Sequence, residues 1–283
     1  MILLPRVALA LLVATALFVA WQVHTGGALR AQFDRDVAAG RAREHAARYM
    51  SDTELVRLPE QVQRYLVTAA TAGAPYPQEY RVRFRGRLRS GPAADWMPVE
   101  VEQVSFTDPP ARLFFLRATM KGLPVIGLHR LVNGHATMDI RLFGLIPVMQ
   151  AAGPLMDRAE SVTLLNDMAV LAPPTLLDPA ITWRELSFDS VAATFRHAGQ
   201  TVQATLVFGS SGRLLDFVSD DRAAASPDGK HFTARRWSTP VRDYIAFGPH
   251  ELASRGAARW HLPEGAFDYA QLEMLEVVWL PRE

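Results

Sequence analysis

The sequence predicts an α+β fold: a large, curved, mostly antiparallel β-sheet shaped like half a barrel, with a helical insert, preceded by an N-terminal transmembrane helix and a stem helix. Three observations predict this fold. Residues 7–29 carry no charged side chain. After Pro77 the apolar residues change from a helical period to alternation, and turn signals separate many short strands. One long apolar run, which ends near Leu171, interrupts the strands.

The charge-free segment predicts a membrane-spanning helix. At about 1.5 Å per residue it would reach ~34 Å, enough for a hydrocarbon layer of ~30 Å. A cleaved signal peptide is the alternative, because Ala14-Thr15-Ala16 has the small-x-small pattern of a cleavage site. The apolar run nevertheless continues to Trp21, a residue typical of membrane interfaces, and this favours an uncleaved anchor over residues 1–30.

Residues 31–75 predict a helical stem. Leu29, Phe33 and Val37 have helical spacing, and Pro59 suits the first turn of a further helix. The break from Gly73 to Pro77 then marks the start of a β-rich domain over residues 76–283.

The β-rich domain contains two groups of predicted strands. Tyr80, Val82 and Phe84 alternate with arginines, which is typical of a half-buried strand. Further strands are expected at residues 99–102, 112–119, 123–132, 137–142, 191–196, 202–208, 214–219, 244–247, 258–262 and 272–279. Between the groups we expect the helical insert, near residues 155–178, where Asp157 and Glu160 have the spacing of a capping box.

Composition excludes several kinds of site. The chain has no cysteine, so disulfides, thiolate zinc sites and thiol nucleophiles are excluded. Residues 1–30 hold two of the 30 basic residues and none of the 29 acidic ones, so the remainder is nearly neutral. A nearly neutral domain gives no case for nucleic acid as a partner. The eight histidines show no metal-binding spacing, and we expect neither a metal nor a cofactor.

The first predicted strand carries a ladder of arginines on one face: Arg81, Arg83, Arg85, Arg87 and Arg89. Cross-strand ion pairs explain part of the ladder, with Glu100 expected opposite Arg87 and Glu102 opposite Arg85. Arg81 and Arg83 would then lack an acid. The alternative is functional: Arg81, Arg83 and Arg85 form a candidate face for phospholipid headgroups or another anion.

A second candidate site is a polar cluster. Asn166 and Asp167 interrupt the apolar insert, so at least one of them should face protein. Asp220, Asp221 and Arg222 follow a predicted strand and could supply partners. A structural network of ion pairs is the simpler interpretation. The alternative is a hydrolase that uses Asp167, Asp220 or Asp221 as acid or base, with Arg222 orienting an anionic substrate.

Several blocks of residues carry a family resemblance: Leu165-Asn166-Asp167-Met168, Leu171-Ala172-Pro173, Ser219-Asp220-Asp221-Arg222 and Trp237-Ser238-Thr239-Pro240. Their order and spacing resemble an uncharacterised bacterial family, a domain of unknown function that often follows an N-terminal membrane segment. The resemblance covers about residues 55–280. It implies a shared fold and no established activity, so no catalytic residue is transferred.

Together these observations favour a membrane-tethered domain whose curved sheet binds a lipid or another amphipathic ligand. The outer-membrane lipoprotein carriers are similar in expected architecture. A hydrolase, or an envelope scaffold that docks through the arginine face, are the alternatives. The expected location is the bacterial cytoplasmic (inner) membrane, with a single span. The arginines that follow the span favour a cytoplasmic C-terminal domain, whereas the short N-terminal flank resembles an export signal, and we expect the domain on the extracytoplasmic side.

Overall fold

The computed structural model of the protein describes residues 3–43, 49–69, 76–226 and 228–280. The helices are α1 (Leu3–Thr25), α2 (Gly27–Arg41), α3 (Asp52–Leu55), α4 (Glu60–Ala69), α5 (Pro154–Leu171) and the 3-10 helix η1 (Pro173–Leu177). The strands are β1 (Glu79–Leu88), β2 (Met97–Thr107), β3 (Pro110–Met120), β4 (Leu123–Val132), β5 (His135–Leu142), β6 (Ile146–Ala152), β7 (Ile181–Ser187), β8 (Ser190–His197), β9 (Gln200–Phe208), β10 (Leu214–Ser219), β11 (Ala223–Ala225), β12 (Phe232–Ala234), β13 (Trp237–Ser238), β14 (Val241–Phe247), β15 (His250–Leu262) and β16 (Gly265–Leu280).

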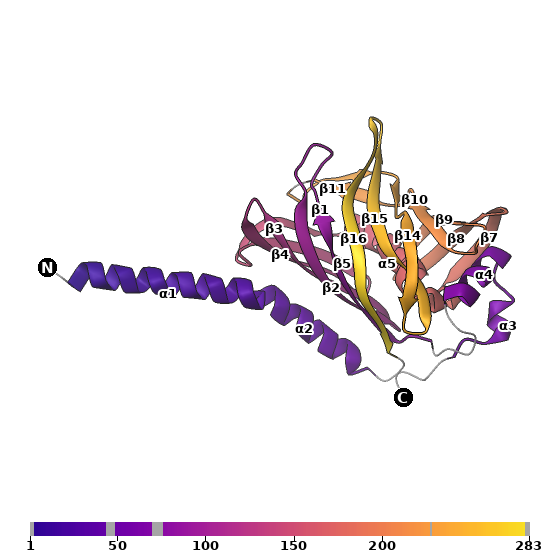
Figure 1. Ribbon diagram of the computed structural model, residues 1–283, viewed down its shortest axis with the longest axis horizontal. Coiled ribbons are helices and arrows are strands. Elements are labelled where there is room, and N and C mark those ends of the chain that lie inside the picture. The colour runs from indigo at the N-terminus through magenta and orange to yellow at the C-terminus, as the bar shows by residue number, and fades with distance from the viewer. Residues whose placement is uncertain (1–2, 44–48, 70–75, 227, 281–283) are drawn as a thin grey trace.

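One sheet of 14 strands dominates the molecule, in the order β6-β5-β4-β3-β2-β1-β16-β15-β13-β10-β9-β8-β7, with β14 paired to β15. β11 and β12 form a separate two-stranded sheet. Helix α5 contacts strands near both ends of the large sheet, β5 and β6 at one end and β9 and β10 at the other. The sheet therefore curves around α5, as Figure 1 shows. The predicted fold class, a large antiparallel sheet with a helical insert, is confirmed.

The curvature gives the sheet a concave face toward α5 and a convex face toward α2. Alternation along β1 assigns its side chains: Tyr80 and Val82 are buried on the concave side, whereas Arg81 and Arg83 are exposed on the convex side. Period-two alternation is what a strand with one buried face requires.

Protein fills the concave side around α5. This helix buries 14 of its 18 residues, so it is apolar on nearly every side rather than amphipathic. Its Leu164 and Leu165 pack in the main core, which also takes Tyr65 from α4 and Phe195 and Phe217 from the strands. The chain itself therefore fills the concave space around α5, where a half-barrel could otherwise hold a ligand.

The N-terminal helices differ in their surroundings. α1 is exposed from Arg6 to Phe18 and partly buried near its end, and its apolar segment is long enough to cross a membrane, a property that N-terminal signal sequences share. α2 packs on the convex face through Leu29, Phe33 and Val37. Gly26, between the two helices, has a φ of +76°, and a Cβ there would lie 2.7 Å from the Phe115 ring. Glycine thus allows the chain to bend against the sheet.

The helices expected as a stem are therefore part of the packed domain: α2 lies along the sheet, and α4 contributes Tyr65 and Leu66 to the core. The predicted break at Gly73 to Pro77 lies largely outside the described residues. Four strands were not anticipated: the three-residue strands β11 and β12, and the longer strands β6 and β7. β6 and β7 are the outermost strands of the large sheet, and β7 is exposed along most of its length, so neither shows clear alternation.

Candidate functional site

The predicted polar cluster lies in part between α5 and the concave face. Asn166 and Asp167 are both buried, which confirms that this interruption of the apolar run faces protein. Asp167 accepts hydrogen bonds from Arg112 Nε at 2.5 Å and from Gln103 Nε2 at 2.8 Å. Arg112 on β3 and Gln103 on β2 are also buried. The charge of Asp167 is thus balanced by Arg112, which the residues next to Asp167 in the sequence do not indicate.

Glu160 lies on the same helix, nearer to its N-terminus than Asp167, and is fully buried. Its carboxylate oxygens are 3.2 Å from Arg222 Nη2, 3.3 Å from His129 Nε2 and 3.5 Å from Arg112 Nη1. Burial alone would raise the pKa of Glu160, but His129, Arg222 and Arg112 outweigh it and hold that pKa well below its ordinary value. We refer to Arg112, His129, Glu160, Asp167 and Arg222 as the buried ion cluster.

Asp220 and Asp221 do not join the buried ion cluster. Asp220 forms an exposed, bidentate pair with Arg236, with both distances 2.8 Å. Asp221 pairs with Arg158 at 2.6 Å and accepts a hydrogen bond from the backbone of Gln203. Adjacent residues at a strand end point to opposite sides, which explains the separation.

The hydrolase hypothesis required these carboxylates and Arg222 to surround one open cleft. The structure brings together Asn166, Asp167 and Arg222, and it seals them with side chains from β2, β3 and β4. Arg222 is further covered by the rings of Trp237 and Trp260, at 4.5 and 5.7 Å. This arrangement supports the interpretation as a structural network of ion pairs.

Three members of the buried ion cluster were missed from the sequence: Arg112, His129 and Glu160. Glu160 has the spacing of a capping residue, but α5 begins at Pro154, and Asp157 accepts instead from the backbone of Ala136 at 2.6 Å. Arg112 opens a predicted strand and carries no local signal of burial. The available signal was that Glu160 lies just before the mostly apolar run from Val162 to Leu171, which a solvated cap would not need.

The arginine ladder lies on the convex face, but its register differs from the prediction. Glu100 pairs with Arg85 and Glu102 with Arg83, two residues from the expected positions. The connection between β1 and β2 is long enough to place Trp96 against Arg87 and Arg89, so that pairing begins only at Leu88 and Met97.

The expectation that Arg81 and Arg83 lack acids was wrong. Arg81 contacts Glu79 at 2.6 Å, and Arg83 contacts Glu276 of β16 at 3.5 Å. Arg85 pairs with Glu273, also on β16, at 2.9 Å. The acids that balance the predicted face therefore come from β16, nearly 200 residues further along the chain, and from the start of β1 itself.

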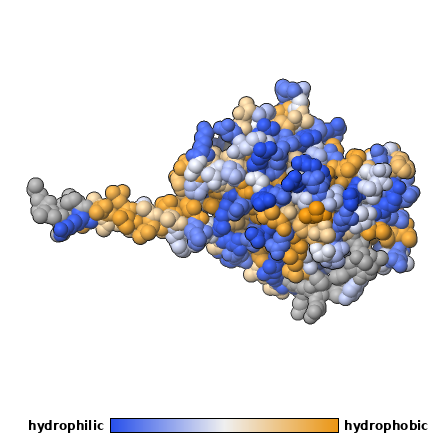
Figure 2. Space-filling view, in the orientation of Figure 1, coloured by the Kyte–Doolittle hydropathy of each residue, from blue (hydrophilic) through white to orange (hydrophobic). Residues whose placement is uncertain are grey.

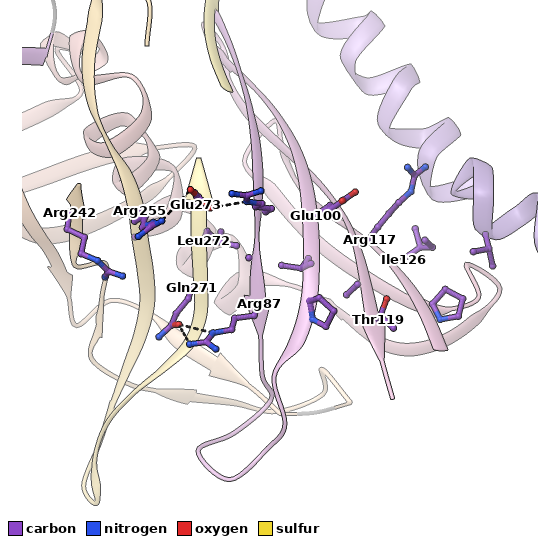
Figure 3. A pocket seen from close by; sticks show the side chains of 18 residues that line it. Arg87, Glu100, Arg117, Thr119, Ile126, Arg242, Arg255, Gln271, Leu272 and Glu273 are labelled. Atoms are coloured by element: carbon purple, nitrogen blue, oxygen red, sulfur yellow. Dashed lines mark hydrogen bonds and ion pairs between the residues drawn. The ribbon is translucent and has the colours of Figure 1, made fainter. Parts of the chain in front are cut away.

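A row of directly paired residues crosses the convex face from β14 to β4: Arg242, Arg255, Glu273, Arg85, Glu100, Arg117 and Ile126. A second row runs beside it: Gln271, Arg87, Pro98, Thr119 and Pro124. Between the rows lies a hollow of about 740 Å³, which we call the arginine trough (Figure 3). Val23, near the end of α1, forms part of its lining.

The arginine trough is strongly positive. Five arginines and two glutamates line it, and Asp243, 3.6 Å from Arg242 and 3.4 Å from Arg255, offsets one of the three excess positive charges. Glu273 is shared by Arg85 and Arg255, and the hydrogen bond from Arg85 lowers the pKa of Glu273.

Two of these arginines lack a carboxylate partner within the described parts of the chain. Arg87 donates to the amide oxygen of Gln271, at 2.9 and 2.7 Å. Arg117 donates only to the backbone oxygen of His24, at 3.3 Å. Chemically, the trough is suited to an anion that accepts hydrogen bonds from guanidinium groups. Among the described residues, no group of three or more histidine or acidic side chains could hold a metal ion.

The model of a family of unknown function, DUF6544, matches residues 48–272, so the chain belongs to this family. No curated protein matches the chain in sequence. Two solved structures share a distant likeness. A DUF1329 family protein from Desulfovibrio piger is 10% identical, with 80% of this chain and 90% of that chain covered and a TM-score of 0.43. A LolA superfamily protein from Nitrosomonas europaea is 10% identical, with 79% and 93% covered and a TM-score of 0.33.

Proposed function

We propose that this DUF6544 family member is a membrane-tethered lipid-binding protein, in which α1 is a single-pass anchor and the arginine trough takes an anionic lipid headgroup. The observation that carries the proposal is the trough itself: an open hollow with an excess of positive charge next to the end of an apolar helix. Its volume of about 740 Å³ lies within the usual range of ligand sites, about 300–1,000 Å³.

The balance of charge favours an anionic ligand. Arginines on the predicted face, such as Arg81 and Arg83, already have acids, so the uncompensated charge lies further along the strands at Arg87 and Arg117. A phosphate group could replace the weak neutral acceptors that these two guanidinium groups now contact. The site is thus shifted from the predicted face toward the end of α1.

The position of the trough favours a lipid over a free anion. Val23 lines the trough, and Arg117 donates to the backbone oxygen of His24, so the site lies where α1 ends. A helix that spans the hydrocarbon layer ends among the headgroups. Figure 2 shows hydrophilic residues gathered on this face of the domain, beside the hydrophobic surface of α1. We expect the domain on the extracytoplasmic side of the inner membrane.

Titration with a short-chain lipid tests this function. The full chain, reconstituted in phosphatidylcholine nanodiscs, is titrated calorimetrically with water-soluble dihexanoyl phosphatidic acid and, separately, with inorganic phosphate. We expect the lipid to bind more tightly than phosphate, because apolar residues such as Pro98, Pro124 and Ile126 line the same hollow. Neutralising Arg87, Arg117 and Arg242 together to glutamine should raise the Kd by about 150-fold, at about 1 kcal/mol for each charge.

A matched triple variant controls for net charge. Arg57, Arg184 and Arg196 are exposed and lie near α3, β7 and β8, away from α1 (Figure 1). Their replacement by glutamine should leave the Kd within about twofold. An equal rise in the Kd of both triple variants would show that binding depends only on the overall charge of the protein. That result would overturn the trough as the binding site. Failure of the native protein to bind either ligand would leave the scaffold hypothesis for this face.

A further inference from the structure

Two hairpin turns lie close together beside the end of α1. The β3–β4 turn contains Lys121 and Gly122, and the β5–β6 turn contains Phe143 and Gly144. The backbone N–H of Phe143 donates to the oxygen of Pro124 at 2.8 Å, which joins the two turns. A Cβ built on Gly144 would lie 3.8 Å from the backbone oxygen of Gln22 in α1. These turns therefore form the edge of the domain nearest to the apolar helix.

This edge is unusually apolar for an exposed surface. Leu123 is 42% exposed, Ile146 is 57% exposed and Val148 is 42% exposed. We call these three residues the apolar rim. Single exposed apolar side chains need no explanation, but these three gather at one edge of the domain, on β4 and β6, the two strands that flank β5. Behind it, Met120 and Leu142 extend the patch into an apolar cluster on the concave face.

The β5–β6 turn has an unusual residue for its conformation. Four hairpins in the described chain have two consecutive residues with positive φ, and their first residues are Lys121, Asn133, Phe143 and Ala198. This turn type favours asparagine followed by glycine, as at Asn133 and Gly134. A bulky aromatic residue at a φ of +56° is strained. The hydrogen bond from its backbone N–H to the oxygen of Pro124 holds Phe143 in this conformation.

We propose that the apolar rim inserts into the interface of the bilayer that α1 spans, as a second contact that fixes the orientation of the domain. This inference rests on the anchor of the proposed function and not on headgroup binding in the trough. Lys121, one of two lysines in the chain, lies beside Leu123 and suits the phosphate level. Arg117 lies four residues before Lys121 on β3, about 13 Å away along the strand, so insertion would hold the trough just above the headgroups.

Site-specific fluorescence tests the proposal, and the absence of cysteine from the chain makes each label unique. Single variants Ile146→Cys, Leu123→Cys, Leu12→Cys and Phe188→Cys of the full chain are labelled with NBD and reconstituted in phosphatidylcholine vesicles. A fraction of the lipid carries a doxyl quencher near the headgroup or deep in the acyl chain. Phe188 is 78% exposed and lies on the β7–β8 turn, away from α1, and Leu12 lies near the middle of α1.

We expect the labels at Ile146 and Leu123 to be quenched at least twofold more strongly by the shallow quencher than the label at Phe188. The label at Leu12 should respond to the deep quencher. Quenching at Leu12 without quenching at Ile146 and Leu123 would overturn the proposal and leave the anchor intact. A label at Leu12 that is not quenched would overturn the anchor and this inference together.

The trough is tested separately in the same vesicles. Neutralising Arg87, Arg117 and Arg242 should leave the quenching at Ile146 unchanged, because phosphatidylcholine is zwitterionic and insertion of apolar side chains needs no anionic lipid. Loss of quenching in this variant would show that the arginines, rather than the apolar rim, hold the domain on the membrane, and would overturn the proposal.

Discussion

Arg112 and Arg117 lie five residues apart on β3, on opposite faces of the sheet and in opposite surroundings. Arg112 is buried on the concave side, where it contacts both Asp167 and Glu160. Arg117 is exposed on the convex side, where its guanidinium group meets only a backbone oxygen and an aromatic ring. The same residue type, on the same strand, is fully compensated in one place and available to a ligand in the other.

This difference separates charges that are paired inside the fold from charges that stay exposed on its surface. In the buried ion cluster, two arginines and a histidine meet two carboxylates in a site with little solvent access. In the arginine trough, five arginines and two glutamates line an open hollow. Buried charges persist only when paired, whereas an uncompensated exposed charge costs little and can attract an anion. We therefore expect substitutions in the cluster to change stability and substitutions in the trough to change binding.

The largest effect is expected from the centre of the cluster. Glu160→Leu leaves Arg112, His129 and Arg222 facing one another without their shared carboxylate. The free energy of unfolding should fall by about 3–5 kcal/mol, the usual cost of removing one partner from a buried network. Urea denaturation of the full chain in mild detergent, followed by tryptophan fluorescence, measures it. A loss below about 1 kcal/mol would show that the cluster is not a stabilising element.

Acid should lower the stability that the buried ion cluster gives to the fold. Because the pKa of Glu160 is lower in the folded state than in the unfolded chain, its contribution is present above about pH 4.5 and is lost as the pH falls further. One proton taken up only by the unfolded chain accounts for at most about 2 kcal/mol between pH 4.5 and 3.0. Glu160→Gln should remove this part of the pH dependence, as judged by denaturation at both pH values. An identical change in the free energy of unfolding with pH in the native protein and in the variant would contradict this role of Glu160.

A smaller effect on binding should distinguish two arginines of the same ladder. Arg87→Gln, inside the trough, should weaken binding of dihexanoyl phosphatidic acid about fivefold, or about 1 kcal/mol. Arg81→Gln should have little effect, because Arg81 is already paired with Glu79. Calorimetric titration of both variants in phosphatidylcholine nanodiscs measures the difference. Equal weakening by both would favour the wider face first expected from the sequence.

The smallest effect is expected at Asp220. Asp220 and Arg236 form an exposed pair, so Asp220→Asn should change the free energy of unfolding by no more than about 0.5 kcal/mol. Thermal unfolding beside Glu160→Leu provides the comparison. A cost close to that of Glu160→Leu would place Asp220 in the stabilising network after all.

Much of the fold could be predicted from local sequence. The alternation of Tyr80 and Val82 with arginines gives β1, and Asn133-Gly134 gives the β4–β5 hairpin, because each signal acts over a few residues. β6 escaped prediction because an edge strand has fewer buried positions to create a pattern. The packing of α2 on the convex face also escaped prediction, since helical spacing alone does not say which surface a helix covers.

The candidate sites depended more on pairing between distant strands. Asp167 could be identified because a carboxylate within an apolar run needs a partner, but its partner Arg112 lies 55 residues earlier. The trough could not be assembled from sequence, because its rows join seven strands whose order and register local patterns do not determine. A shift of two residues in the β1–β2 register was enough to misplace Glu100.

The central claim is that an anionic lipid binds the convex trough and not the concave interior, and photo-crosslinking tests it most directly. The full chain in phosphatidylcholine vesicles is exposed to a phosphatidic acid analogue with a diazirine near its headgroup, and adducts are mapped by mass spectrometry. We predict adducts on Arg85–Arg87, Arg117–Thr119 and Gln271–Glu273, above those from a zwitterionic analogue. Adducts concentrated in α5, or none above the zwitterionic analogue, would contradict the account.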